Sequence, residues 1–245
     1  MLESQIQQRS KKMKIVFGII ALFFLAGCGS NDNTADIPPV GNELTYTFTS
    51  GTEGWQGDFA DYPLEREAIY EFAFKYTHLP FPLDENDGAL MLSGNNHSDD
   101  LFMFLKKKID GLEPNTPYRL NFTVEFASNV ADGMIGVGGS PGEGVLVKVG
   151  ATTQEPVKIL DDSGWYRMSI DKGNQSNGGS DMVVIGDFSN DTDQNIYTLK
   201  TLHNDTPFIA KSNGDGELWC IVGTDSGFES TTTIYYSTIK VQISN

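Results

Sequence analysis

Apolar side chains alternate with polar ones along several segments of this chain. Leu44, Tyr46 and Phe48 are separated by threonines, and the same period of two returns over residues 70–76 and 120–126. A period of two places successive side chains on opposite faces of a strand, so these segments are typical of strands buried on one face. Outside the N-terminal segment no stretch shows a period of 3.6, which argues against alternating strands and helices. The pattern predicts an all-β chain with a single antiparallel β-sandwich or jelly roll.

Turn-forming residues separate the predicted strands, in keeping with 26 glycines in the chain. A single domain is predicted from residue 43 to residue 245, a length that supplies a sizeable core. The strands nearest its two ends, 44–49 and 233–243, are expected to lie side by side. The other predicted strands are 89–93, 101–108, 144–149, 165–170, 182–185 and 218–223.

The N-terminus has the order of a secretion signal. Lys11, Lys12 and Lys14 precede the apolar run 15–26, which ends in small residues. The run is shorter than the roughly 20 residues that a membrane span needs, and its basic, apolar and small segments follow in the order of a signal peptide. Met13 begins such a signal directly, so it is predicted to be the true start.

The end of this signal resembles the lipobox of bacterial lipoproteins. The residues are Leu25-Ala26-Gly27-Cys28. The resemblance implies that residues 1–27 are removed, that Cys28 carries the lipid, including palmitate, and that residues 28–42 form a flexible tether. The expected location is the bacterial cell envelope, outside the cytoplasm and bound to a membrane by acyl chains. Gly29 after the cysteine implies the outer membrane in a Gram-negative cell.

The charge of the chain excludes one class of partner. It carries 17 basic and 33 acidic residues, and removal of the signal takes four basic and one acidic residue, which leaves 13 and 32 and a formal charge of −19. Such a chain is repelled by the phosphate backbone of a nucleic acid, so no nucleic-acid partner is expected. Two cysteines cannot build a disulfide scaffold. Cys220 lies in the apolar run 218–222 and is predicted to be a buried thiol.

Five polar, glycine-rich phrases stand out from the predicted strands and turns. Together they resemble a family of secreted bacterial lipoproteins with a galactose-binding-like or jelly-roll domain, similar to carbohydrate-binding modules. The resemblance covers roughly residues 55–241 and implies a fold and a location without an activity. In chain order, the first to fifth phrases are 54–63, 93–101, 136–143, 171–176 and 223–229.

Catalytic and metal-binding motifs are weak. The stretch 138–142 has the letters of a G-x-S-x-G elbow, but Pro141 lacks the N–H that an oxyanion hole needs and a strand follows instead of a helix. The three histidines lack zinc-site spacing. An EF-hand beginning at Asp191 puts Ile196 at the glycine position. No cofactor is expected. The acidic surplus leaves a structural calcium ion as an open alternative to plain surface solvation.

Two of the phrases combine ring faces with planar polar groups, which suits a sugar. The competing interpretation is that Trp55 packs as a lid and the asparagines and aspartates close turns by bonding their own backbone. The candidate ligand-binding residues are Trp55, Asp58 and Asp61 in the first phrase, Asn95, Asn96, His97, Asp99 and Asp100 in the second, and Asp225 in the fifth.

The sequence therefore favours a lipid-anchored extracytoplasmic binding or interaction module, whose polar loops face a glycan or an envelope protein, and no residue is assigned catalysis. The alternative is an envelope-associated hydrolase of glycans or esters that uses acids such as Asp58, Asp99 and Asp225. A structural envelope protein without a small ligand is a third hypothesis.

Overall fold

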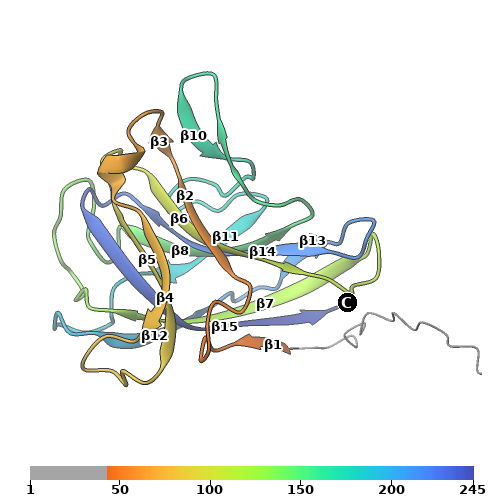
Figure 1. The fold of residues 1–245 in the computed structure, drawn as a ribbon, viewed down its shortest axis with the longest axis horizontal. Coiled ribbons are helices and arrows are strands. Elements are labelled where there is room, and N and C mark those ends of the chain that lie inside the picture. Colours follow the sequence, from red (N-terminus) through yellow and green to blue (C-terminus); the bar gives the residue numbers. More distant parts are fainter. Residues whose placement is uncertain (1–42) are drawn as a thin grey trace, which may run out of the picture. The chain divides into compact units, whose positions relative to one another are not determined.

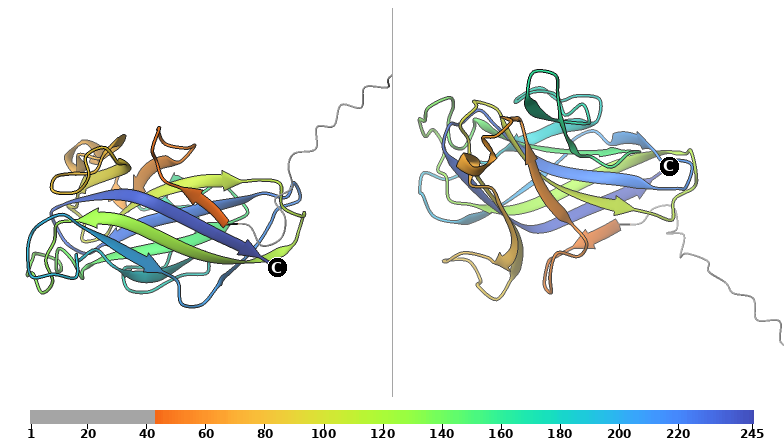
Figure 2. Two further views of the ribbon diagram at one scale, coloured as in Figure 1. Left: turned by 90° about the horizontal axis from the view of Figure 1, so that it is seen from below. Right: turned by 45° about the horizontal axis from the view of Figure 1, so that its top comes forward.

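The structure is a computed structural model, and it describes residues 43–245. The predicted signal, Cys28 and the tether lie outside the described residues. Two large antiparallel sheets lie face to face, and a small third sheet stands out from them (Figures 1 and 2). The fold is an all-β antiparallel sandwich, which confirms the fold class predicted from the alternation.

The larger sheet has seven strands. Its central path runs β12-β7-β15-β5-β4, while β1 pairs with β15 and β13 with β7. The strands are β1 (Glu43–Tyr46), β4 (Ala73–His78), β5 (Gly88–Asn95), β7 (Pro117–Ser128), β12 (Thr198–His203), β13 (Phe208–Lys211) and β15 (Thr231–Ser244).

The second sheet has five strands in the order β11-β8-β14-β6-β2. These are β2 (Gln56–Ala60), β6 (Leu101–Ile109), β8 (Val145–Thr152), β11 (Met182–Asp187) and β14 (Leu218–Ser226). The small third sheet holds β3 (Tyr62–Pro63), β9 (Lys158–Leu160) and β10 (Trp165–Met168), and a short 3-10 helix, η1 (Glu67–Tyr70), follows β3.

The main core lies between the two large sheets, and the alternation of the sequence builds it. On β7 the side chains of Leu120, Phe122, Val124 and Phe126 are fully buried. Opposite them, alternate residues of β6, β8 and β14 fill the same space, and Cys220 is among them. Burial raises the pKa of the Cys220 thiol to about 12, so this residue behaves as a small apolar side chain.

The first and last described strands are neighbours. Glu43 pairs with Gln242 at the start of an antiparallel ladder between β1 and β15. This confirms the expected pairing of the terminal strands. The described chain therefore begins and ends at the same end of the sandwich.

Some predicted boundaries are wrong. The strand expected over 70–76 starts only at Ala73, because residues 67–70 turn into η1 and Glu71 takes a left-handed φ of 50°. Strands β2, β12 and β13 were not predicted, because their residues show no clear alternation. The stretch around Ser140 is a turn that leads into β8, as predicted, and not a nucleophile elbow. Within residues 43–245 no helix has the length and apolar character that crossing a membrane requires.

Candidate functional site

The polar phrases of the sequence meet in space. The Ser98 hydroxyl, in the second phrase, donates a hydrogen bond of 3.0 Å to the Asp61 carbonyl oxygen, in the first. The Gln175 side-chain amide, in the fourth phrase, donates over 2.8 Å to the Asp99 carbonyl oxygen, in the second. Three segments that are far apart in the chain are thereby joined at one end of the sandwich.

The third and fifth phrases join the same group. The Asn96 side-chain amide donates over 2.9 Å to the Ser226 carbonyl oxygen, which links the second phrase to the fifth. Gly138 packs against Gly227 so closely that a Cβ on Gly138 would lie 2.3 Å from the Gly227 carbonyl oxygen, and the φ of Gly138 is 73°. A residue with a side chain would both clash with Gly227 and be strained at this positive φ, so only glycine fits here. All five phrases therefore form one region, called here the phrase end.

A cluster of buried charges lies beneath the phrase end. The Lys172 ammonium is 2.9 Å from an Asp225 carboxylate oxygen, 3.0 Å from one of Asp61 and 3.8 Å from one of Asp100. Lys148 on β8 approaches the same Asp225 oxygen to 2.7 Å. The side chains of Lys148 and Asp225 are completely buried. These five residues form the charge cluster.

Backbone groups complete the charge cluster. The Lys148 ammonium also donates to the carbonyl oxygens of Lys172 and Asn177, both at 3.0 Å. The Gln175 backbone N–H donates to the Asp225 carboxylate over 3.0 Å. Three N–H donors of Lys148 thus have three acceptors, which meets the condition that makes a buried ammonium tolerable.

The protonation of the charge cluster follows from burial and pairing. Burial opposes the charge on Lys172, but Asp225, Asp61 and Asp100 outweigh that cost and raise its pKa. Burial lowers the pKa of Lys148, and Asp225 offsets part of the effect. Burial raises the pKa of Asp100 to about 6 in spite of the attraction of Lys172. Burial therefore moves the pKa of Asp100 toward neutral pH.

The charge cluster reaches solvent through Arg167 on β10. The Arg167 guanidinium is 3.0 Å from Asp61 and 3.3 Å from Asp100, and it lies over the Trp165 ring at 4.6 Å from the ring centroid. A pocket of about 230 Å³ opens at this point. It is lined by Asp61, Asp100, Arg167, Met168, Ile170, Asp171, Lys172, Gly173 and Asn174.

The segment between β8 and β11, residues 153–181, covers the outer face of the five-stranded sheet. Phe102, Phe104 and Ile221 point to this face, because their neighbours along each strand enter the main core. They are nevertheless fully buried, since Met168 and Ile170 from the covering segment pack on them. The charge cluster is thus enclosed between a sheet and this cover.

Contacts along the edges hold the cover in place. Lys106 on β6 pairs with Glu155 at 2.6 Å, and Lys158 on β9 pairs with Asp58 on β2 at 3.0 Å. At Gly150 on β8 the chain passes so close that a Cβ would lie 1.9 Å from the Asp181 carbonyl oxygen. The cover is therefore anchored at both sides of the sheet.

Some predicted ligand residues have structural positions. Trp55 is 1% exposed and packs edge-on against Tyr46, so its ring face is closed to a ligand and its prediction as a stacking residue is wrong. Asn96 is 2% exposed, and its side-chain oxygen accepts a hydrogen bond of 3.0 Å from the Ser98 backbone N–H, as the turn-closing interpretation predicts. Its side-chain NH2 group donates to the fifth phrase. Asp58 faces Lys158 at the edge of the cover.

Of the other predicted residues in the second phrase, Asn95 ends β5 and pairs with Thr231. His97 is exposed, with its ring edge-on to Tyr70. Asp99 is exposed, and its backbone carbonyl oxygen accepts a hydrogen bond from the Gln175 side-chain amide. None of these three lines the pocket.

Three predicted residues do come together. Asp61, Asp100 and Asp225 hold carboxylate oxygens within 4.8 Å of one another, and they form the only grouping of this kind among residues 43–245. The Lys172 ammonium lies among them, where a metal ion would otherwise balance their charge. The donor set resembles a site for calcium, but its centre is already occupied by a cation of the chain itself.

The basic members of the site were missed by the sequence analysis. Lys148 interrupts the apolar strand 145–149 and Lys172 sits in a polar phrase, and both patterns are ordinary for exposed lysines. Arg167 lies in a predicted strand with no distinguishing neighbour. The sequence therefore held no signal that sets these three basic residues apart from exposed ones.

The chain was compared with known proteins. No protein family matches it, and no curated protein sequence does. Among solved structures it is similar to the CBM22-1 xylan-binding domain of Xyn10C from Paenibacillus barcinonensis, with 12% identity over 84% of this chain and 97% of that one and a TM-score of 0.38. The family 11 carbohydrate-binding module of the cellulosomal cellulase Lic26A-Cel5E from Clostridium thermocellum is 11% identical over 82% and 94%, with a TM-score of 0.41.

The K1 cleaved adhesin domain of Lys-gingipain from Porphyromonas gingivalis is 13% identical over 84% of this chain and 99% of that one, with a TM-score of 0.35. Likenesses at this level carry no argument about function. The function has to be argued from the geometry of the pocket.

Proposed function

We propose that this protein is an extracytoplasmic glycan-binding module, held at a membrane of the bacterial cell envelope by a lipid on Cys28. One observation carries the binding proposal, which is the pocket where Arg167 and Asp100 bring the charge cluster to the surface. Charged groups at the base of a pocket are fixed in position, so they present donors and acceptors to a ligand without reorganising.

The chemistry of the pocket suits hydroxyl groups. A sugar hydroxyl both donates and accepts hydrogen bonds, so a carboxylate beside a guanidinium satisfies both of its functions. Asp100 and Arg167 offer this pair at 3.3 Å, and Asn174 and Gly173 also line the pocket. Met168 and Ile170 add apolar surface for the CH groups of a ring.

The position of the pocket is consistent with presentation away from an anchor. Thr231 at the start of β15 pairs with Asn95 in the phrase end, whereas Gln242 near its far end pairs with Glu43. A strand of 14 residues spans about 45 Å. The described chain therefore begins at the end of the sandwich opposite to the pocket. The lipobox residues support the anchor itself.

Titration calorimetry of the full chain in detergent micelles, with a panel of neutral mono- and oligosaccharides, tests the binding proposal. Binding is expected for the wild type and a loss of at least tenfold in affinity for Arg167→Ala. Arg119→Ala, an exposed arginine of β7, is the matched control and keeps wild-type affinity. Absence of heat with every sugar, or equal affinity for the Arg167 variant, would refute the proposal.

A hydrolase is the second candidate, because burial places the pKa of Asp100 at about 6, which suits a general acid. Of the acids suggested by the sequence, Asp225 is buried beneath Lys172 and Asp58 is paired with Lys158. Release of reducing ends or of carboxylic acid from the same panel, abolished by Asp100→Asn, would favour this candidate. A protein that co-purifies with the full chain, with no sugar bound, would favour an envelope protein as the partner.

A further inference from the structure

A second hollow lies on the covering segment 153–181, next to the pocket at Arg167. It forms where this segment meets the end of β8 and the strand β13, and its volume is about 280 Å³. None of the five residues of the charge cluster lines it. Among the residues that do are Thr152, Thr153, Ser169, Ile170, Asp181 and Ile209.

The hollow and the pocket at Arg167 share a wall. Ile170 lines both, while the residue before it, Ser169, lines only the hollow and the residue after it, Asp171, lines only the pocket. The Asp171 backbone N–H donates a hydrogen bond of 2.8 Å to the carboxylate of Asp181, which lines the hollow. The Cα atoms of residues 169 and 171 are at most about 7 Å apart, because they are two residues apart in the chain. The two cavities are therefore close enough for linked sugar residues to occupy both.

The lining of the hollow combines the two kinds of surface that a sugar ring requires. Ile209 on β13 is 56% exposed and offers apolar surface to the CH groups of a ring. The Asp181 carboxylate accepts hydrogen bonds, and the exposed Ser169 and Thr153 carry hydroxyl groups that both donate and accept. The volume lies just below the range of roughly 300–1,000 Å³ typical of sites for larger ligands, so the hollow suits one sugar residue.

We infer that the pocket at Arg167 and this hollow are consecutive subsites, which hold neighbouring residues of one glycan chain along the covering segment. The inference rests on the proposed function and deepens it, from a sugar in a pocket to a chain of at least two linked residues. Both cavities are open to solvent, so internal residues of a chain can fill them. Once one residue is held beside Arg167, its neighbour is tethered close to the hollow and binds as an intramolecular step.

The first part of the test varies the length of the ligand. Titration calorimetry of the full wild-type chain in detergent micelles uses methyl glycosides of neutral sugars and the matching di- to hexasaccharides. Affinity is expected to rise at least about tenfold from the methyl glycoside to the hexasaccharide, because the tethered residue adds contacts in the hollow. On a long polysaccharide the number of bound protein molecules should exceed the number of chain ends.

The second part removes the hollow and keeps the pocket. Ile209→Ala combined with Asp181→Asn takes away the apolar surface and the charge, while the amide oxygen of the new side chain can still accept the Asp171 N–H. This double variant should bind the hexasaccharide about as weakly as the methyl glycoside, whose own affinity should stay unchanged. Ile196→Ala combined with Asp193→Asn is the matched control, because both residues are exposed and line neither cavity.

The outcomes separate this inference from the proposed function. A hexasaccharide that binds no more tightly than the methyl glycoside overturns the inference and leaves the proposed function standing. A gain in affinity with length that survives in the double variant of the hollow does the same, because the chain then leaves the pocket by another path. Absence of binding to every sugar overturns both.

Discussion

The outer faces of the two large sheets are built from the same kind of alternating strand, but one face is exposed to solvent and the other is buried. On the seven-stranded sheet the outward residues Leu199, Thr201 and His203 of β12 are exposed. On the five-stranded sheet the outward residues Phe102 of β6 and Lys148 of β8 are completely buried. The difference comes from one connection, because only the second face is covered by residues 153–181.

The cover changes the environment of a charged side chain on the outer face, because it removes the side chain from water. An outward lysine on an uncovered strand is solvated, and its ion pairs contribute little. Lys148 occupies an outward position, yet the cover removes it from water, so Asp225 and two backbone carbonyls are needed to compensate its charge. The covered face thereby gains a rigid polar site that an open face does not hold.

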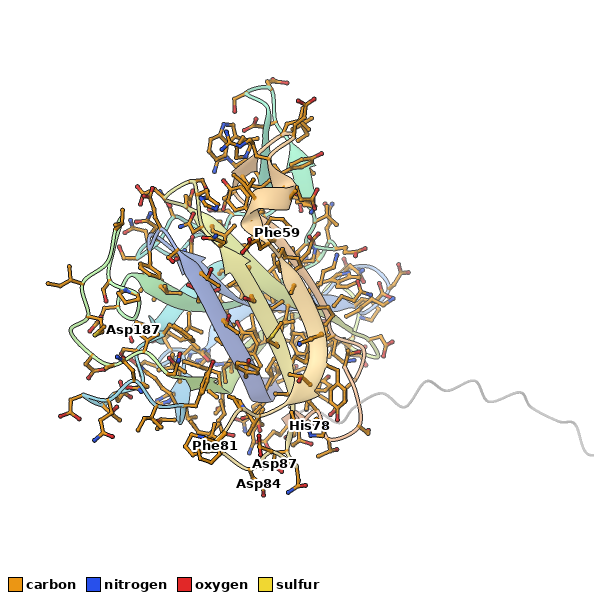
Figure 3. All side chains as sticks on the ribbon, turned by 60° about the vertical axis from the view of Figure 1, so that its left-hand side comes forward. Phe59, His78, Phe81, Asp84, Asp87 and Asp187 are labelled. Carbon is orange, nitrogen blue, oxygen red and sulfur yellow. The ribbon has the colours of Figure 1, made fainter. Side chains whose placement is uncertain are left out.

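The open face has a polar hollow of its own. It has a volume of about 230 Å³ and is lined in part by Asp87, Glu125 and Ser237, and the Glu125 carboxylate accepts a hydrogen bond of 2.6 Å from Ser237. Phe81, 77% exposed, lies near this end on the β4–β5 connection, away from Phe59 and the small sheet (Figure 3). Lysine and arginine are missing from the lining of this hollow, which separates it from the pocket of the covered face.

The strongest test of the comparison is removal of the central carboxylate. Asp225→Ala leaves Lys148 and Lys172 without their shared partner in a buried site, so unfolding in urea should require about 3 to 5 kcal/mol less free energy. Asp205→Ala removes an almost fully exposed acid that lies 3.7 Å from His203, and it should give no measurable change. Equal effects of the two variants would show that the covered face is no different from the open one.

A second test asks whether Lys172 takes the place of a metal ion. In Lys172→Met the carboxylates of Asp61, Asp100 and Asp225 lose their central cation, which should lower the melting temperature in EDTA. Added calcium should restore part of the loss in this variant, because an ion that binds the native state stabilises it. The wild type should show no calcium shift. A wild-type shift equal to that of the variant would place the calcium elsewhere in the chain.

The smallest expected effect concerns pH. Burial raises the pKa of Asp100 from about 3.9, its ordinary value, to about 6, so between these values the folded state binds more protons than the unfolded state. This group therefore makes stability fall as pH rises from about 4 to 6. Asp100→Asn removes that slope and should gain about 1 to 2 kcal/mol relative to the wild type between pH 4 and 7.

Urea unfolding at four pH values measures this slope. Asp99→Asn, one residue away and exposed, is the matched control and should keep the wild-type slope. A slope that survives in the Asp100 variant would assign the titration to another member of the charge cluster.

The fold could be predicted from the sequence to a large extent. Alternation along residues 120–126 predicts which side chains face the core, and all four apolar residues of this segment are buried in the structure. The prediction failed at Tyr70, where alternating letters continue across a 3-10 helix and a left-handed Glu71. Local periodicity cannot detect a turn whose residues also satisfy the pattern.

The candidate site was only partly accessible. Asp61, Asp100 and Asp225 stood out because they lie in unusual polar phrases, and the structure brings them within 4.8 Å. For Trp55 the sequence left a ligand-binding and a packing interpretation open, since a tryptophan beside polar residues looks the same in sequence whether its ring is exposed or buried, and the structure buries it. Arg167 gave no signal, because its role depends on two partners that are distant in the chain.

The sequence by itself determined the class of fold and the burial of Cys220, because both follow from the short-range pattern of apolar residues. The tertiary structure alone decided which outer face is covered, and hence that Lys148 and Asp225 form a buried pair. The physical reason is that the period of two along a strand fixes the face of the strand on which each residue lies. Whether that face meets water depends on a segment packed from elsewhere in the chain.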